Sequence, residues 1–85
     1  MSLELFANDR YTILKLLKEN QITIKEETYA SLSQQEIADL AHKSKLKTNK
    51  ILNELIEAGF LASSIRGKYS ITESGQRVLK VFEEF

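Results

Sequence analysis

Hydrophobic residues near the start of the chain recur at the spacing of an α-helix. Over residues 3–20 most of them fall on one side when successive residues are turned by about 100°, which predicts a first helix. The residues of this stripe are Leu3, Phe6, Ala7, Tyr11, Ile13, Leu14 and Leu17. Leu5 and Leu16 lie off it, eleven residues apart, and form a second stripe. One core cannot cover both stripes, so the second predicts a packing partner, either the last helix or another subunit.

The helical period then ends. Residues 22–24 and 29–32 have the β-branched and aromatic composition of short strands, and the polar residues 25–28 between them predict a loop. Glu26 and Glu27 in this loop are interpreted as exposed charges, because neighbours in sequence rarely converge on one substrate atom as a catalytic pair does.

Two capping signals predict a pair of helices in the middle of the chain. Ser33 and Glu36 have the S-x-x-E spacing of a capping box, and a helix is expected from there to about Leu40 or His42. Its expected buried residues are Ile37, Leu40 and Ala41. After a short break, Ser44 is expected to cap a third helix. The apolar positions of that helix are Thr48, Ile51, Leu52, Leu55 and Ile56.

Glycines mark the end of the third helix and the turn of a hairpin. Gly59 tolerates the left-handed conformation in which many helices end. Beyond it, residues 60–65 and 68–71 flank Arg66-Gly67 and predict a β-hairpin. One face of this hairpin is expected to hold Tyr69 and Ile71, and the other Lys68 and Ser70.

A last helix is predicted over residues 73–84, with Thr72 as its N-cap. Its apolar arc reaches Phe85, and the second stripe of helix 3–20 is the expected partner for that arc. The two helices are therefore predicted to be dimerisation elements. The predicted interface residues are Leu5, Leu16, Val81, Phe82 and Phe85.

Length and composition limit what these elements can build. A chain of 85 residues predicts one domain, residues 1–85. A chain of this size buries about 60–65% of its unfolded surface, so pairing would add stability. The absence of cysteine excludes disulfides, thiolate metal sites and thiol nucleophiles. No apolar run approaches the roughly 20 residues that span a bilayer, so the sequence predicts a soluble, cytoplasmic protein with no membrane partner.

The net charge of zero averages over two unlike parts of the chain. Residues 43–53 and 60–72 carry six cations and no carboxylate, whereas the other six cations share the rest of the chain with all twelve carboxylates. The cations of the first part are Lys43, Lys45, Lys47, Lys50, Arg66 and Lys68. Such asymmetry is typical of a surface that binds a polyanion. A solvated lysine face is the alternative interpretation.

The order helix, strand, helix, helix, strand, strand, helix predicts an α+β, mainly α fold of the winged-helix type. Several short motifs accompany this order: Ile37-Ala38, Ser44, Ile51-Leu52 with Leu55, Glu57-Ala58-Gly59-Phe60-Leu61, and Ile71-Thr72-Glu73-Ser74-Gly75. Through them, residues 33–75 resemble the DNA-binding core of prokaryotic winged helix-turn-helix regulators of the MarR, ArsR and PadR kind. The turn departs from that pattern, because His42-Lys43 stands where a glycine and an aliphatic residue are usual.

The resemblance and the charge together point to double-stranded DNA. Helix 45–58 is expected in the major groove, with the hairpin 60–71 as the wing on the backbone or minor groove. The predicted DNA-binding residues are Lys43, Ser44, Lys45, Lys47, Asn49, Lys50, Asn53, Arg66 and Lys68. Asn49 is the expected base reader, because asparagine binds adenine bidentately; an exposed polar helix face is the alternative. Leu46 would touch a thymine methyl or lie buried under the wing, and burial is expected.

Enzymatic chemistry has little support in the sequence. His42 is the single histidine, and one histidine forms neither a catalytic triad nor a metal site with any visible motif. Gly59, Gly67 and Gly75 are isolated glycines at turns and helix ends, and they do not form a phosphate-binding loop. No cofactor is expected.

The sequence therefore predicts a homodimer that binds double-stranded DNA sequence-specifically on the nucleoid or a plasmid. Its expected role is that of a transcriptional repressor, or of a plasmid or phage copy-control or partition factor. The alternative is a winged-helix protein–protein adaptor in replication, transcription or partition machinery.

Overall fold

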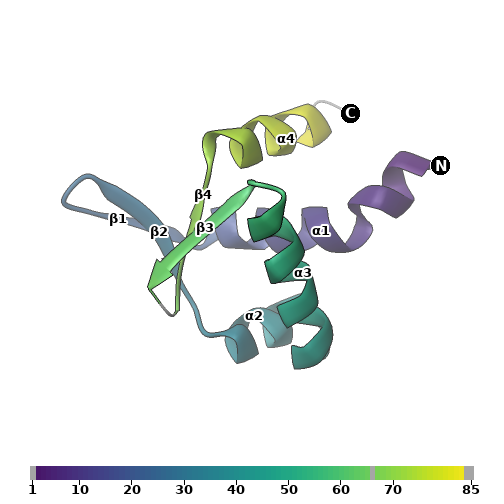
Figure 1. Cartoon of the computed structure of the whole chain (residues 1–85), viewed down its shortest axis with the longest axis horizontal. Helices are drawn as coiled ribbons and strands as arrows, with labels where there is room; N and C mark the ends of the chain where they lie inside the picture. The colour runs from purple at the N-terminus through teal and green to yellow at the C-terminus, as the bar shows by residue number, and fades with distance from the viewer. Residues whose placement is uncertain (1, 66, 84–85) are drawn as a thin grey trace.

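The chain folds into an α+β structure that is mainly helical. The computed structural model describes residues 2–65 and 67–83, and the side chains of residues 9–63 and 67–81. Within these residues there are four helices and one antiparallel sheet of four strands (Figure 1). The elements in chain order are α1 (Ser2–Glu19), β1 (Gln21–Ile24), β2 (Glu27–Ser31), α2 (Gln34–Ala41), α3 (Lys45–Glu57), β3 (Leu61–Ile65), β4 (Lys68–Ile71) and α4 (Glu73–Glu83).

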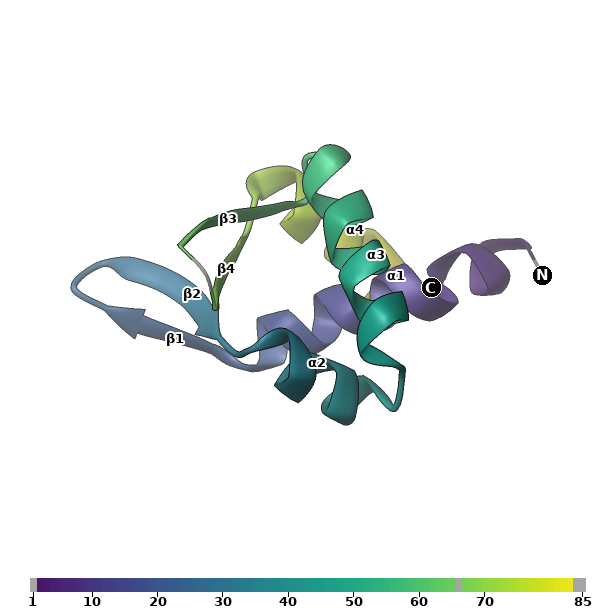
Figure 2. The same cartoon turned by 60° about the horizontal axis from the view of Figure 1, so that its bottom comes forward.

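The sheet has the strand order β1-β2-β4-β3. β2 pairs with β4 through Ala30 opposite Tyr69, so the sheet joins the middle of the chain to the β3–β4 hairpin. β1 confirms the strand predicted at residues 22–24 and forms the outer strand of the sheet, although the predicted element order counted one strand there and not two. The β1–β2 hairpin projects away from the helices in both views (Figures 1 and 2). The other three strands with α2 and α3 are compatible with a winged helix-turn-helix.

α1 is the element around which the others pack. It contacts α2, α3, β4 and α4, and the three helices α1, α2 and α3 contact one another (Figure 2). The expected stripe of α1 is confirmed where side chains are described, since Ile13, Leu14 and Leu17 are buried. The remaining core residues come from every other element except β1: Ala30, Ile37, Ile51, Leu52, Leu55, Leu61, Tyr69, Ile71 and Leu79.

α4 packs against α1 within the chain. Leu16 is half-buried against the chain's own core, and Val81 on α4 is 51% exposed. The side chains of Leu5, Phe82 and Phe85 lie outside the described residues. The last helix is therefore one partner of α1, and pairing with a second subunit stays a prediction.

Two residues expected in the core are exposed instead. Leu40 is 51% exposed, because the buried face of α2 is centred among Ile37, Ala38 and Ala41, about 110° away from it around the helix. Ile56 is 37% exposed for the same kind of reason, since it lies about 90° from the centre of the buried face of α3. In both helices the apolar spacing was correct, and the buried arc is narrower than the spacing suggested.

The turn between α2 and α3 keeps its compact form without a glycine. His42 adopts the left-handed conformation with φ 57° and ψ 44°. Its neighbour Lys43 closes the turn by donating its backbone N–H to the carbonyl of Ala38 at 2.9 Å. His42 therefore takes the backbone conformation that a glycine adopts at low cost.

The start of α4 is set by a cap and by a close backbone approach. The Thr72 hydroxyl accepts from the backbone N–H of Gly75 at 3.1 Å and donates to the carbonyl of Gly59, which confirms the predicted cap. Gly75 also allows a close backbone approach, because a Cβ there would lie 2.2 Å from the carbonyl oxygen of Phe60. Glycine at this position lets α4 begin directly against the chain that enters β3.

Candidate nucleic-acid interface

α3 is a capped helix with one buried face and one outward face. The Ser44 hydroxyl accepts from the backbone N–H of Lys47 at 3.1 Å, as predicted, and fixes the start of the helix. The inward face buries Thr48, Ile51, Leu52 and Leu55. The opposite face presents a stripe at helical spacing, called here the outward stripe, which consists of Leu46, Lys50, Asn53 and Glu57.

The position of Leu46 corrects the sequence-based expectation. Its side chain is 85% exposed, although burial under the wing was expected. The reason is its angle on the helix, since Leu46 lies about 170° from the centre of the buried face of α3. A large apolar side chain thus stands in water at the first turn of α3, next to the basic residues Lys45 and Lys47.

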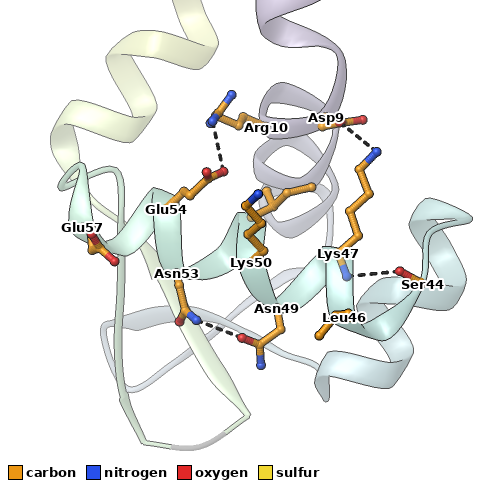
Figure 3. Close-up of a pocket in the computed structure, with 11 residues that line it drawn as sticks. Asp9, Arg10, Ser44, Leu46, Lys47, Asn49, Lys50, Asn53, Glu54 and Glu57 are labelled. Atoms are coloured by element: carbon orange, nitrogen blue, oxygen red, sulfur yellow. Dashed lines mark hydrogen bonds and ion pairs between the residues drawn. The ribbon is translucent and has the colours of Figure 1, made fainter.

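Asn49 is held by two amide contacts inside the chain. Its Nδ2 donates to Gln34 Oε1 on α2 at 2.9 Å. Its Oδ1 accepts from Asn53 Nδ2 at 2.8 Å, the contact that Figure 3 marks between these two residues. The side chain is half-buried, whereas Asn53 is exposed. Asn49 therefore links α2 to α3 and orients Asn53, which is the more accessible of the two amides.

A single carboxylate engages two of the predicted DNA-binding lysines. Asp9 on α1 lies with Oδ1 2.7 Å from Lys43 Nζ and with Oδ2 3.2 Å from Lys47 Nζ. Hydrogen bonds from Lys43, then from Lys47, hold the pKa of the Asp9 carboxyl below its usual range. The Lys43 side chain is only 17% exposed. Lys43, one of the predicted DNA-binding residues, lies in an ion pair between α1 and the turn.

Asp9 was not singled out from the sequence. It precedes Lys43 by 34 positions, and no local motif connects an acid in the middle of a helix to a lysine in a later turn. A further ion pair joins α1 to α3, with Arg10 Nη2 3.0 Å from Glu54 Oε1. This pair and the Asp9–Lys47 pair line a groove between α1 and α3 (Figure 3). Figure 3 shows the Lys47 side chain turned toward Asp9, and Asn49 with Asn53 on another side of α3.

The remaining predicted cations lie at the N-terminal end of α3 and on the hairpin. Lys45 is exposed and lines a shallow pocket with Ser33, Gly67 and Tyr69. Lys68 is half-buried, with its Nζ 4.7 Å from the ring centroid of Tyr29 on β2. Arg66 lies outside the described residues. The hairpin turn and the start of α3 therefore line the same pocket, and Lys68 is partly engaged by an aromatic face.

Two specific features are absent from the part of the chain that the structure describes. There, no group of three or more His, Cys, Asp or Glu side chains is placed to hold a metal ion. Among the same residues, no helix has the length and apolar character needed to cross a bilayer. His42 is exposed at the end of α2.

Comparisons with known proteins bear on the fold. No protein-family model matches the chain, and no curated protein matches it significantly. A solved structure, that of the reduced (Fe(II)) CO-sensing protein from R. rubrum, is similar with a TM-score of 0.77 at 26% sequence identity. The similarity covers 91% of this chain and 36% of that protein, so this chain is similar to about a third of the CO-sensing protein.

Proposed function

We propose that the chain is a winged helix-turn-helix module that binds double-stranded DNA with α3 in the major groove. The observation that carries this proposal is the outward stripe of α3. It presents Leu46, Lys50 and Asn53 from a rigid, capped helix whose opposite face is buried in the core. An α-helix fits the major groove, and its N-terminal half faces the base edges in helix-turn-helix proteins.

Each residue of the stripe suits a different feature of the groove. Asn53 is suited to adenine N6 and N7, and Lys50 to guanine O6 and N7 or to a phosphate. Leu46 is suited to the methyl group of thymine, an apolar contact that its exposure favours. Asn49 becomes a positioning residue for Asn53 in this arrangement, because its own amide already spans α2 and α3.

The charges along α3 limit the proposed contact to the part of the helix that ends at Asn53. Lys45, Ser44 and Lys50 lie toward the N-terminal end, whereas Glu54 and Glu57 occupy the last turns. Carboxylates near phosphates would be repelled, so the end of the helix beyond Asn53, which carries Glu54 and Glu57, is expected to stay outside the groove. Lys45 and the wing residues Arg66 and Lys68 are proposed to hold the phosphate backbone.

Binding as a homodimer remains part of the proposal. α1 and α4 pack together and supply the predicted interface, on which Val81 is exposed. A two-fold dimer would place two α3 helices about 34–36 Å apart, one DNA turn, on a near-palindromic site. Repression, copy control or partition on a nucleoid or plasmid is the proposed cytoplasmic role. The similarity to a CO-sensing protein supports the fold only, and no cofactor is proposed from it.

Fluorescence anisotropy on labelled duplexes at low salt tests DNA binding. The double variant Lys50→Ala with Asn53→Ala is expected to lose about thirtyfold or more in affinity, since it removes two base contacts of about 1–3 kcal/mol each. Lys80→Ala on α4 removes an equal charge far from the stripe and serves as the control. Absence of binding to any duplex, or equal affinities for the double variant and the control, would overturn the proposal.

A protein-adaptor function is the second candidate, and one observation favours it. Ile22 and Ile24 lie on the same side of β1 and are 45% and 50% exposed on the projecting hairpin. An adaptor is expected to recover one stoichiometric partner in a pull-down that nuclease treatment does not affect. Loss of that partner on Ile22→Ser with Ile24→Ser would support this function. Loss of all recovered protein on nuclease treatment would contradict it.

A further inference from the structure

We infer that Asp9 is a specificity residue of the proposed DNA interface, because it withdraws Lys47 and Lys43 from contact with phosphates. This inference rests on the proposed DNA binding. Lysine contacts to phosphate are independent of sequence and supply essentially all non-specific affinity. A carboxylate that engages such lysines lowers non-specific binding and leaves the base contacts of the outward stripe in place.

The geometry assigns different states to the two lysines. The two Asp9 oxygens are divided between them, Oδ1 to Lys43 at 2.7 Å and Oδ2 to Lys47 at 3.2 Å. The Lys43 side chain is 17% exposed, so its ammonium group is committed to the ion pair. The Lys47 side chain is 54% exposed and makes the longer contact, so it is the one that a phosphate is able to reach.

A phosphate that binds Lys47 must compete with Asp9 for the same ammonium group. The carboxylate also repels the approaching phosphate, and the two effects act in the same direction. Lys50 is exposed on the outward stripe, and no hydrogen bond or ion pair engages it within the described residues. Two lysines of the same helix, three positions apart, therefore differ in their availability to DNA.

Asp9→Asn removes the negative charge with little change in shape. Glu19→Gln is the matched control, because it makes the same change in net charge on the same helix, about 15 Å away along its axis. Affinity for a mixed-sequence duplex is measured by anisotropy across a salt series, with thermal melting as a check of folding. Asp9→Asn is expected to bind about threefold to tenfold more tightly than Glu19→Gln at low salt. Its salt slope is expected to be steeper by about 0.9, the value for one additional phosphate contact.

A second variant tests the inference even where Asp9→Asn folds poorly. In the wild-type chain, Lys47→Ala is expected to cost about twofold or less in affinity for the mixed duplex, and Lys50→Ala several-fold more. In the Asp9→Asn background the two losses are expected to become similar. Equal losses already in the wild-type chain would overturn the inference.

The outcomes separate this inference from the proposed function. If the wild type binds DNA but Asp9→Asn binds no more tightly than Glu19→Gln, the role of Asp9 is overturned and the proposed DNA binding is not. Binding by Asp9→Asn alone supports the inference in its strongest form, with Asp9 masking the site. Absence of binding by the wild type, Asp9→Asn and Glu19→Gln overturns both.

Discussion

The two exposed flanks of α3 carry similar residues in very different states. On the flank that faces α1, Lys47 and Glu54 are each paired with a charge from α1. On the outward stripe, Leu46 and Lys50 are exposed on the opposite side from the core. The comparison teaches that a count of lysines overstates the positive charge available to a polyanion, because a neighbouring helix has already engaged part of it.

The largest expected effect comes from a charge placed on the outward stripe. Leu46→Asp is expected to lower DNA affinity by about a hundredfold or more, since it removes an apolar contact and sets a carboxylate against phosphates. Because Leu46 is 85% exposed, the melting temperature should hardly change. Leu40→Asp makes the same substitution at an exposed position on α2 and serves as the control. Equal DNA affinity of the two variants would contradict the assignment of the outward stripe as the surface that contacts DNA.

The next largest expected effect is on stability, and it comes from a substitution on the buried face of α3. The Thr48 hydroxyl is fully buried and has no hydrogen-bond partner among the described residues. Thr48→Val keeps the shape and removes the unsatisfied group, so the free energy of unfolding is expected to rise by about 1–2 kcal/mol.

Thr72→Val is the matched control for that substitution. The Thr72 hydroxyl caps α4, so the same change there is expected to destabilise the protein by about 1 kcal/mol in urea unfolding. Destabilisation by Thr48→Val of the same size as by Thr72→Val would contradict the assignment of Thr48 as unsatisfied.

A substitution in the turn between α2 and α3 is expected to have a smaller effect on the free energy of unfolding. His42 holds a left-handed conformation at φ 57°, which costs a non-glycine residue about 1–2 kcal/mol. His42→Gly removes that cost and adds about 0.5–1 kcal/mol of backbone entropy loss on folding, so a net gain of about 0.5 kcal/mol is expected. Chemical unfolding with and without the substitution measures the difference. A loss of stability would show that the His42 side chain makes a stabilising contribution of its own.

The smallest expected effect is a pH dependence of stability that comes from the ion pairs of Asp9 with Lys43 and Lys47. Lys43 and Lys47 lower the pKa of Asp9 from its ordinary value of 3.8, so the ion pairs stabilise the fold fully above that value. The stabilisation is lost as the pH falls below 3.8 through the lower pKa of the folded state. Melting from pH 7 to pH 2 is expected to show a slightly steeper acid loss for wild type than for Asp9→Asn. Parallel curves would mean that the pairs contribute nothing to stability.

Much of the fold was predictable because its signals are local. The capping box of Ser33 and Glu36, the cap at Ser44 and the left-handed Gly59 each involve residues within one turn of one another. The β3–β4 hairpin was predicted in the same way from its alternation and its turn. The β1–β2 hairpin was predicted in part. Both strand segments were recognised, but the sequence did not predict that they pair with each other and that β1 becomes the outer strand of the sheet.

The candidate site was less predictable, because exposure and pairing depend on where distant segments meet. The sequence by itself determined the helix caps, the turns and the uneven distribution of charge, all of which follow from neighbouring residues. Only the tertiary structure decided that Leu46 faces water, that Asn49 binds Gln34, and that Asp9 engages Lys43 and Lys47. Each of these depends on the angle and position at which α1, α2 and α3 pack, which the core as a whole sets and no local motif records.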